Sequence, residues 1–111
     1  MSARLQQLDA LLREQPGDPF LVYARGTELR QLGRMDEALS AWTTLRETHP
    51  DYVGVYYHLA ALQQELELPV AVVESTYRDG LAAASRASDA HSRSELQAAF
   101  QNWQLVRDGL V

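Results

Sequence analysis

The stretch Leu32-Gly33-Arg34-Met35-Asp36-Glu37-Ala38-Leu39 predicts the turn of a helical hairpin. Gly33 is suited to end the first helix, because the left-handed backbone that closes a helix costs little only for glycine. From Met35 onward apolar residues recur every three or four positions, which is typical of an amphipathic helix. The stretch therefore predicts two antiparallel helices joined at Gly33.

Proline and glycine divide the rest of the chain in the same way. Asp18 is a good N-cap and Pro19 stands at the first helical position, while Pro50 and Pro69 mark further breaks. The last helix is expected to begin with a capping box, Ser92 to Glu95. Strict alternation of apolar and polar residues does not extend beyond four positions, so no strand is expected. The predicted fold class is all-α, with antiparallel helices at about residues 2–15, 19–32, 35–48, 52–66, 69–87 and 91–108.

The pattern recurs after 34 residues, the interval between Pro16 and Pro50 and between Tyr23 and Tyr57. A helical hairpin of this period is typical of tetratricopeptide repeats. Residues 19–52 resemble one full repeat of that family, of the small bacterial type. The family's small, glycine, alanine, aromatic and proline positions are held by Gly26, Gly33, Ala38, Trp42 and Pro50.

The resemblance implies an α-solenoid of helix-turn-helix repeats that stack with a right-handed superhelical twist. Its expected parts are a partial repeat (2–18), a full repeat (19–52), a degenerate repeat (53–87) and a C-terminal capping helix (91–108).

The resemblance also implies how the helices pack, and two residues of this chain depart from the family pattern. Gly26 and Ala38 are expected to be small because two helix backbones approach closely, and Trp42 is expected to be buried between helices. Glu67 stands where the second repeat should have its turn glycine, and Arg25 stands where the family usually has leucine.

Composition restricts the function classes. The chain has 111 residues and a net charge of −5, which suits one domain and argues against nucleic-acid binding. Cysteine is absent, which excludes disulfides and thiolate sites. No apolar run is long enough to span a membrane and the first residues do not resemble a signal peptide, so we expect a cytoplasmic protein. All ten basic residues are arginine, which fits either adaptation to high salt or a GC-rich genome.

The polar residues form no dense catalytic or metal-ligand pattern. His91 and Glu95 are four residues apart on one helix, where we expect a solvated ion pair. The sequence has no glycine-rich phosphate loop and no nucleophile elbow. We therefore expect no enzyme activity, no cofactor and no metal ion.

The resemblance implies a protein that binds a peptide or protein segment in a concave groove lined by the first helix, helix A, of each repeat. The groove positions of the family fall on Phe20, Tyr23, Thr27 and Arg30 in the full repeat, and on Tyr57, Ala61 and Gln64 in the degenerate one. Some family members clamp a terminal carboxylate with lysine and asparagine. The corresponding positions here hold tyrosine, threonine and alanine, so that clamp is not expected.

Two questions remain open at the level of sequence. Tyr23 and Tyr57 either face a ligand or pack against a neighbouring helix. The chain either binds a separate partner or associates with itself into a homo-oligomer, and we expect a monomer. Residues 51–111 carry four arginines against eight acids, a net charge of −4, so a neutral or mildly basic ligand fits better than an acidic one.

Overall fold

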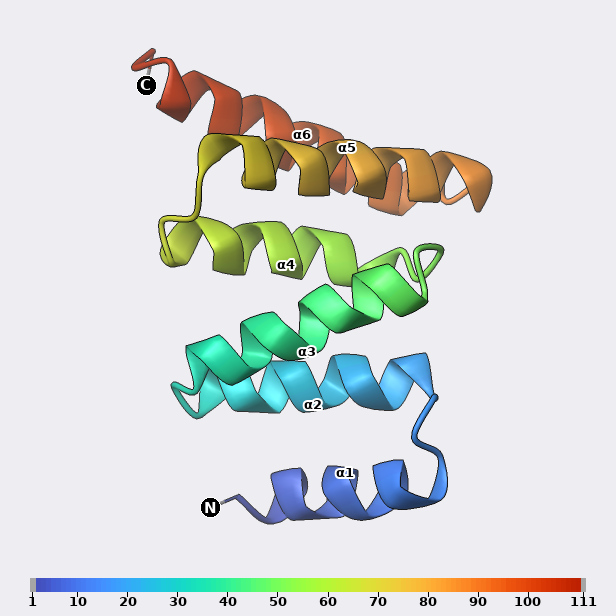
Figure 1. Ribbon diagram of the computed structural model, residues 1–111. Helices are drawn as coiled ribbons and strands as arrows, with labels where there is room; N and C mark the ends of the chain where they lie inside the picture. The colour runs from blue at the N-terminus through green and yellow to red at the C-terminus, as the bar shows by residue number, and fades with distance from the viewer. Residues whose placement is uncertain (1, 111) are drawn as a thin grey trace. The chain divides into compact units, whose positions relative to one another are not determined.

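The computed structural model describes residues 2–110, and every regular element in that part of the chain is an α-helix (Figure 1). The helices are α1 (Ala3–Glu14), α2 (Pro19–Gln31), α3 (Met35–Thr48), α4 (Gly54–Glu65), α5 (Val70–Arg86) and α6 (Ala90–Arg107). Each predicted helix is present, and both of its ends lie within two residues of the predicted positions. The all-α fold class is confirmed.

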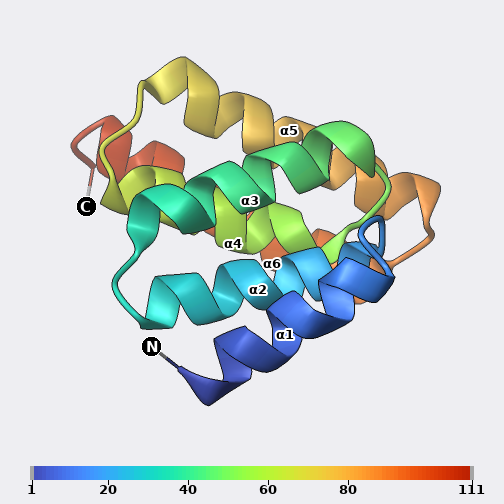
Figure 2. The same ribbon diagram turned by 60° about the horizontal axis from the view of Figure 1, so that its bottom comes forward.

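The helices belong to two compact units, one ending at Val55 and the other beginning at Tyr56. In the first unit α2 lies between α1 and α3 (Figures 1 and 2). In the second unit α5 packs against α6.

Helix α2 begins as the sequence predicts. One carboxylate oxygen of Asp18 accepts hydrogen bonds from the backbone N–H groups of Phe20 (2.9 Å) and Leu21 (3.2 Å). Pro19 occupies the first turn, where its missing N–H leaves no hydrogen bond unmade. The entry into α2 is therefore determined by residues that are neighbours in sequence.

Helix α6 begins differently from the prediction. Its N-cap is Asp89, whose carboxylate accepts hydrogen bonds from the backbone N–H (3.0 Å) and the hydroxyl (2.8 Å) of Ser92. These two hydrogen bonds hold the pKa of Asp89 below its ordinary value. The predicted capping box at Ser92 is wrong, because α6 begins two residues earlier and Ser92 lies in its first turn, where it donates to Asp89 instead of capping the helix.

Gly33 closes α2 in the way that the sequence predicts. Its φ is +79°, in the left-handed region. The backbone N–H of Arg34 donates to the carbonyl of Leu29 over 2.9 Å, which is the long hydrogen bond of a Schellman turn.

Glu67 closes α4 with the same geometry although it is not a glycine. Its φ is +56°, and the backbone N–H of Leu68 donates to the carbonyl of Gln63 over 3.0 Å. Ser88 ends α5 in the same conformation, with φ +53°. These two turns thus keep the geometry of the Gly33 turn while placing an L-residue where glycine is favoured.

Two opposite sides of α2 are covered in the first unit. On one side Leu21 and Ala24 form a buried cluster with Leu8 of α1. On the other side Gly26 lies against the indole of Trp42 from α3. At about 100° per residue these contacts lie roughly opposite each other around the helix, so α2 is held from both sides.

The contact between Gly26 and Trp42 is the closest fit in this unit. Trp42 is 1% exposed, and its Nε1–H donates to the carbonyl of Tyr23 over 3.1 Å. A Cβ atom at Gly26 would collide with the indole ring. The predicted burial of Trp42 is confirmed. The reason expected for Gly26 is wrong, because an aromatic side chain, rather than a second backbone, takes the space.

The second unit uses a comparable contact between α4 and α5. A Cβ atom at Gly80 would lie 2.6 Å from Cβ of Tyr56, which is 1% exposed. Nearby, the hydroxyl of Thr76 donates to the side-chain oxygen of Gln63 over 2.8 Å, and both side chains are buried. This pairing satisfies two polar groups that would otherwise be costly to bury.

Aromatic rings join α5 to α6. Tyr77 stacks on Phe100 with 5.2 Å between ring centroids, and Trp103 lies 5.9 Å from Phe100. The guanidinium of Arg107 lies 4.9 Å from the Trp103 ring and donates to Glu74 over 3.2 Å. Helix α6 also has a polar and exposed face, at Arg93, Gln97 and Gln101.

Replacement of the buried indole should strongly destabilise the first unit. We expect Trp42→Ala to lower the free energy of unfolding by about 3–5 kcal/mol, because it leaves a large cavity beside Gly26 and removes the hydrogen bond to Tyr23. Urea unfolding followed by circular dichroism measures this change. Phe20→Ala removes an exposed aromatic ring from the same unit and should change stability little, and equal losses for the two variants would contradict the packing described here.

The left-handed turn at Glu67 should become more stable with glycine. We expect Glu67→Gly to raise the free energy of unfolding by about 0.5–1 kcal/mol, because glycine relieves the backbone strain at this position. The gain is smaller than the full strain energy, since glycine also increases the conformational entropy of the unfolded chain. Thermal and urea unfolding both measure it. Glu95→Gly makes the same chemical change at an exposed position inside α6 and should instead destabilise by about 0.5–1 kcal/mol. Two changes of the same sign would refute the backbone assignment.

Candidate functional site

Four of the predicted binding residues lie along one face of α2, because their spacing of three and four residues matches the helical turn. Phe20 is 59% exposed, whereas Tyr23, Thr27 and Arg30 are partly buried. The face therefore presents an exposed aromatic ring at the start of the helix and partly covered polar groups beyond it.

Tyr23 is held in an aromatic cluster of the first unit. Its ring stacks against Trp42, with centroids 6.1 Å apart, and lies tilted against Tyr52, with centroids 5.7 Å apart. Burial raises the pKa of Tyr52, with a smaller contribution from Tyr23. The Thr27 hydroxyl donates to the carbonyl of Tyr23 over 3.2 Å. Tyr23 thus packs against α3 and keeps part of its surface accessible.

The other three predicted residues lie along one face of α4 in the second unit. Tyr57 is 42% exposed and meets the ring of His58 edge-on, with 5.4 Å between centroids. Ala61 and Gln64 are partly buried. The side-chain nitrogen of Gln64 donates to the Tyr77 hydroxyl over 2.7 Å, while burial is the main cause that raises the pKa of Tyr77. Gln64 is therefore oriented by α5, and Tyr57 is the exposed member of this face.

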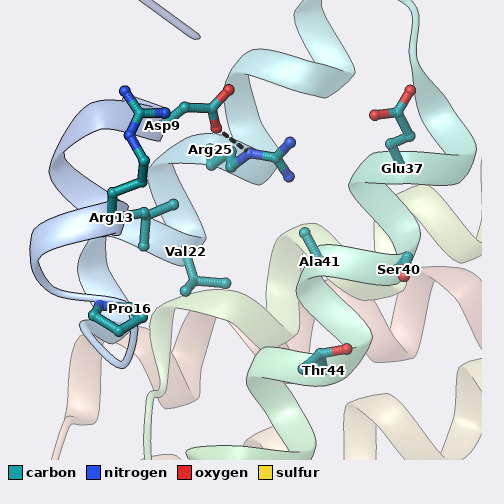
Figure 3. Close-up of a pocket in the computed structure, with 10 residues that line it drawn as sticks. Asp9, Arg13, Pro16, Val22, Arg25, Glu37, Ser40, Ala41 and Thr44 are labelled. Carbon is teal, nitrogen blue, oxygen red and sulfur yellow. Dashed lines mark hydrogen bonds and ion pairs between the residues drawn. The ribbon is translucent and has the colours of Figure 1, made fainter. Parts of the chain in front are cut away.

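An open groove of about 790 Å³ lies on the opposite face of α2, between α1 and α3 (Figure 3). Asp9 and Arg13 of α1 lie on one side and Ser40, Ala41 and Thr44 of α3 on the other. Val22 and Arg25 of α2 lie between them.

The sequence contained one signal of this groove, the arginine at position 25 where the family usually has leucine. In the structure Nε of Arg25 donates to a carboxylate oxygen of Asp9 over 2.6 Å. The two side chains are 30% and 38% exposed, so the pair is reached by solvent. Its partner could not be deduced from the sequence, because the residues are sixteen positions apart and belong to different helices.

His91 and Glu95 lie in the first turns of α6. The ring of His91 lies 3.7 Å from the Glu95 carboxylate, and both side chains are largely exposed, as expected of a solvated pair. No group of three or more histidine, aspartate or glutamate side chains gathers in the described part of the chain. None of the helices described there is long and apolar enough to cross a lipid bilayer.

Comparison with solved structures identifies the family. No protein-family model and no curated protein matches the sequence. The solution structure of a tetratricopeptide repeat domain protein from Salinibacter ruber is similar, with 37% sequence identity and a TM-score of 0.73, over 78% of this chain and 87% of that chain. A crystal structure of a tetratricopeptide repeat domain protein from the same organism is similar with 36% identity and a TM-score of 0.72, over 77% of this chain and 93% of that chain. A protein from Bordetella parapertussis has the same fold at 24% sequence identity, with a TM-score of 0.75, over 97% of this chain and 91% of that chain. Together with the helical hairpins, their turns and the Gly26–Trp42 contact, these similarities show that the chain belongs to the tetratricopeptide repeat family.

Proposed function

We propose that this protein binds a peptide or protein segment through the A-helix faces of α2 and α4. In this proposal α2 and α4 are the first helices of the repeats at 19–52 and 53–87, residues 2–18 are a partial repeat, and α6 is the capping helix. Helical repeat proteins commonly use such faces as extended binding surfaces. The protein acts as a monomer that recruits a separate partner.

The observation that carries the proposal is the exposure of two aromatic rings. Among the large apolar side chains of α2 and α4, Phe20 and Tyr57 are the exposed ones, at 59% and 42%. Both stand at positions that the family resemblance assigns to ligand contact. Exposed aromatic rings on a polar surface are typical of protein-binding sites, because they gain much free energy when a partner covers them.

Tyr23 supports the same proposal by its rigidity. Its ring is fixed between Trp42 and Tyr52, so little side-chain entropy would be lost when a ligand touches its accessible edge. The hydroxyl of a tyrosine can also hydrogen-bond the main chain of a peptide. Tyr23 thus serves as a rigid contact beside the freely exposed Phe20.

The charge of the chain favours a neutral or mildly basic ligand. Residues 51–111 carry four arginines and eight acids, giving 4 − 8 = −4. An acidic segment would be repelled over the range of the screening length, about 8–10 Å at physiological ionic strength. Arg30 then provides a contact to the ligand backbone rather than to an acidic side chain.

The exposed rings can be removed without disturbing the core. Binders are first selected from a random peptide library on the purified wild-type protein, and their dissociation constants are measured by calorimetry. We expect Phe20→Ala and Tyr57→Ala each to weaken binding, and the double variant to weaken it at least tenfold, about 1.4 kcal/mol. Helicity should stay unchanged, because both rings are exposed.

Val72→Ala with Val106→Ala is the matched control, since both valines are exposed and lie on α5 and α6. This control should bind the selected peptides as the wild type does. Failure to select any peptide, or equal affinity for the wild type and the Phe20/Tyr57 double variant, would show that these faces are not the binding site.

A further inference from the structure

The groove between α1 and α3 is separate from the site proposed above. At about 100° per residue, Val22 and Arg25 face roughly away from Tyr23 and Thr27 on α2. The sides between these two faces are occupied by α1, at Leu21 and Ala24, and by α3, at Gly26. A ligand in this groove would therefore touch none of the proposed A-helix contact residues.

The centre of the groove is apolar. Leu12 is packed against the buried cluster of α1 and α2 and remains partly exposed, as do Val22 and Ala41. Figure 3 shows Val22 and Ala41 on neighbouring helices, and both line the groove. The volume of about 790 Å³ lies within the range of about 300–1,000 Å³ that is usual for ligand pockets. The space is sufficient for one leucine-sized side chain and part of the backbone that bears it.

The charges around this centre leave one cation unpaired. Arg25 is bound to Asp9, and Arg34 forms two hydrogen bonds of 2.9 and 2.8 Å with the Glu37 carboxylate. Arg13 also lines the groove, and it has no hydrogen bond or ion pair with any residue among 2–110. The four charged side chains that line the groove sum to 2 − 2 = 0, and with Arg34, which binds Glu37 from outside the lining, the sum is 3 − 2 = +1.

We propose that the groove between α1 and α3 binds a second protein segment, one that presents a leucine-sized side chain and a carboxylate two residues apart. In an extended segment, alternate side chains point to the same side. The apolar side chain would then lie over Val22, between Leu12 and Ala41, while the carboxylate pairs with Arg13. This ligand differs in charge from the neutral or mildly basic one expected on the opposite face.

The proposal can be tested with two synthetic tripeptides, acetyl-Leu-Ala-Asp-amide and acetyl-Leu-Ala-Asn-amide, which differ only in the charged group. Each is titrated into the ¹⁵N-labelled full chain. We expect the aspartate peptide to shift the backbone amides of Val22, Arg25, Ala41 and Thr44, with an affinity of about 1 mM or weaker for so small a ligand. The asparagine peptide should bind about two- to fivefold more weakly, the effect of an exposed ion pair.

Two variants separate the charged contact from the apolar one. Arg13→Gln should bind both peptides equally, because the carboxylate has then lost its partner. Ala41→Gln fills the groove with a longer side chain and should weaken both peptides more than tenfold. Phe20→Ala should bind them as the wild type does, which separates this test from that of the A-helix faces.

Three results would overturn the proposal. The first is that the aspartate peptide shifts no amide of the groove. The second is that wild-type protein binds the aspartate and asparagine peptides equally. The third is that the groove amides move with protein concentration alone, which would make a second copy of this chain the occupant.

Discussion

The indole of Trp42 can reach the backbone of α2 only because residue 26 has no side chain. This contact positions α3 on α2, and it also brings the Trp42 ring against Tyr23, whose carbonyl accepts the indole hydrogen bond. The aromatic part of the proposed binding face therefore depends on the packing beneath it. Tyr56 and Gly80 show the same principle in the second unit. In both units, a glycine within a helix gives up helix propensity so that a large aromatic side chain can be buried.

Helix α2 has a particular role in the first unit, because α1 and α3 cover two of its sides and the other two sides keep exposed or partly exposed side chains. The side with Tyr23 is aromatic and is the proposed binding face. The side with Val22 and Arg25 is apolar at its centre and charged at its rim, where the ion pair between Arg25 and Asp9 is partly exposed. One short helix can therefore present two chemically different surfaces. Repeat proteins make this possible, because each helix is covered only by its immediate neighbours.

The turns show how a repeat can diverge in sequence while keeping its backbone. Glu67 and Ser88 adopt the left-handed conformation that Gly33 adopts without strain, and each turn closes with the same pair of backbone hydrogen bonds. The cost of an L-residue there is of the order of 1–2 kcal/mol, which the packing of a helical hairpin can offset. A missing turn glycine thus weakens a sequence match more than it changes the structure.

The sequence by itself determined the features that depend on neighbouring residues. It predicted the six helices, the Asp18 cap and the turn at Gly33, because caps, turns and helical periodicity act over a few residues. The burial of Trp42 was implied by the family resemblance. The tertiary structure decided the rest: that an indole fills the space at Gly26, that Arg25 pairs with Asp9, and that a groove opens between α1 and α3. These features join residues on different helices. Their geometry depends on how side chains of particular shape and charge meet, which no local pattern specifies.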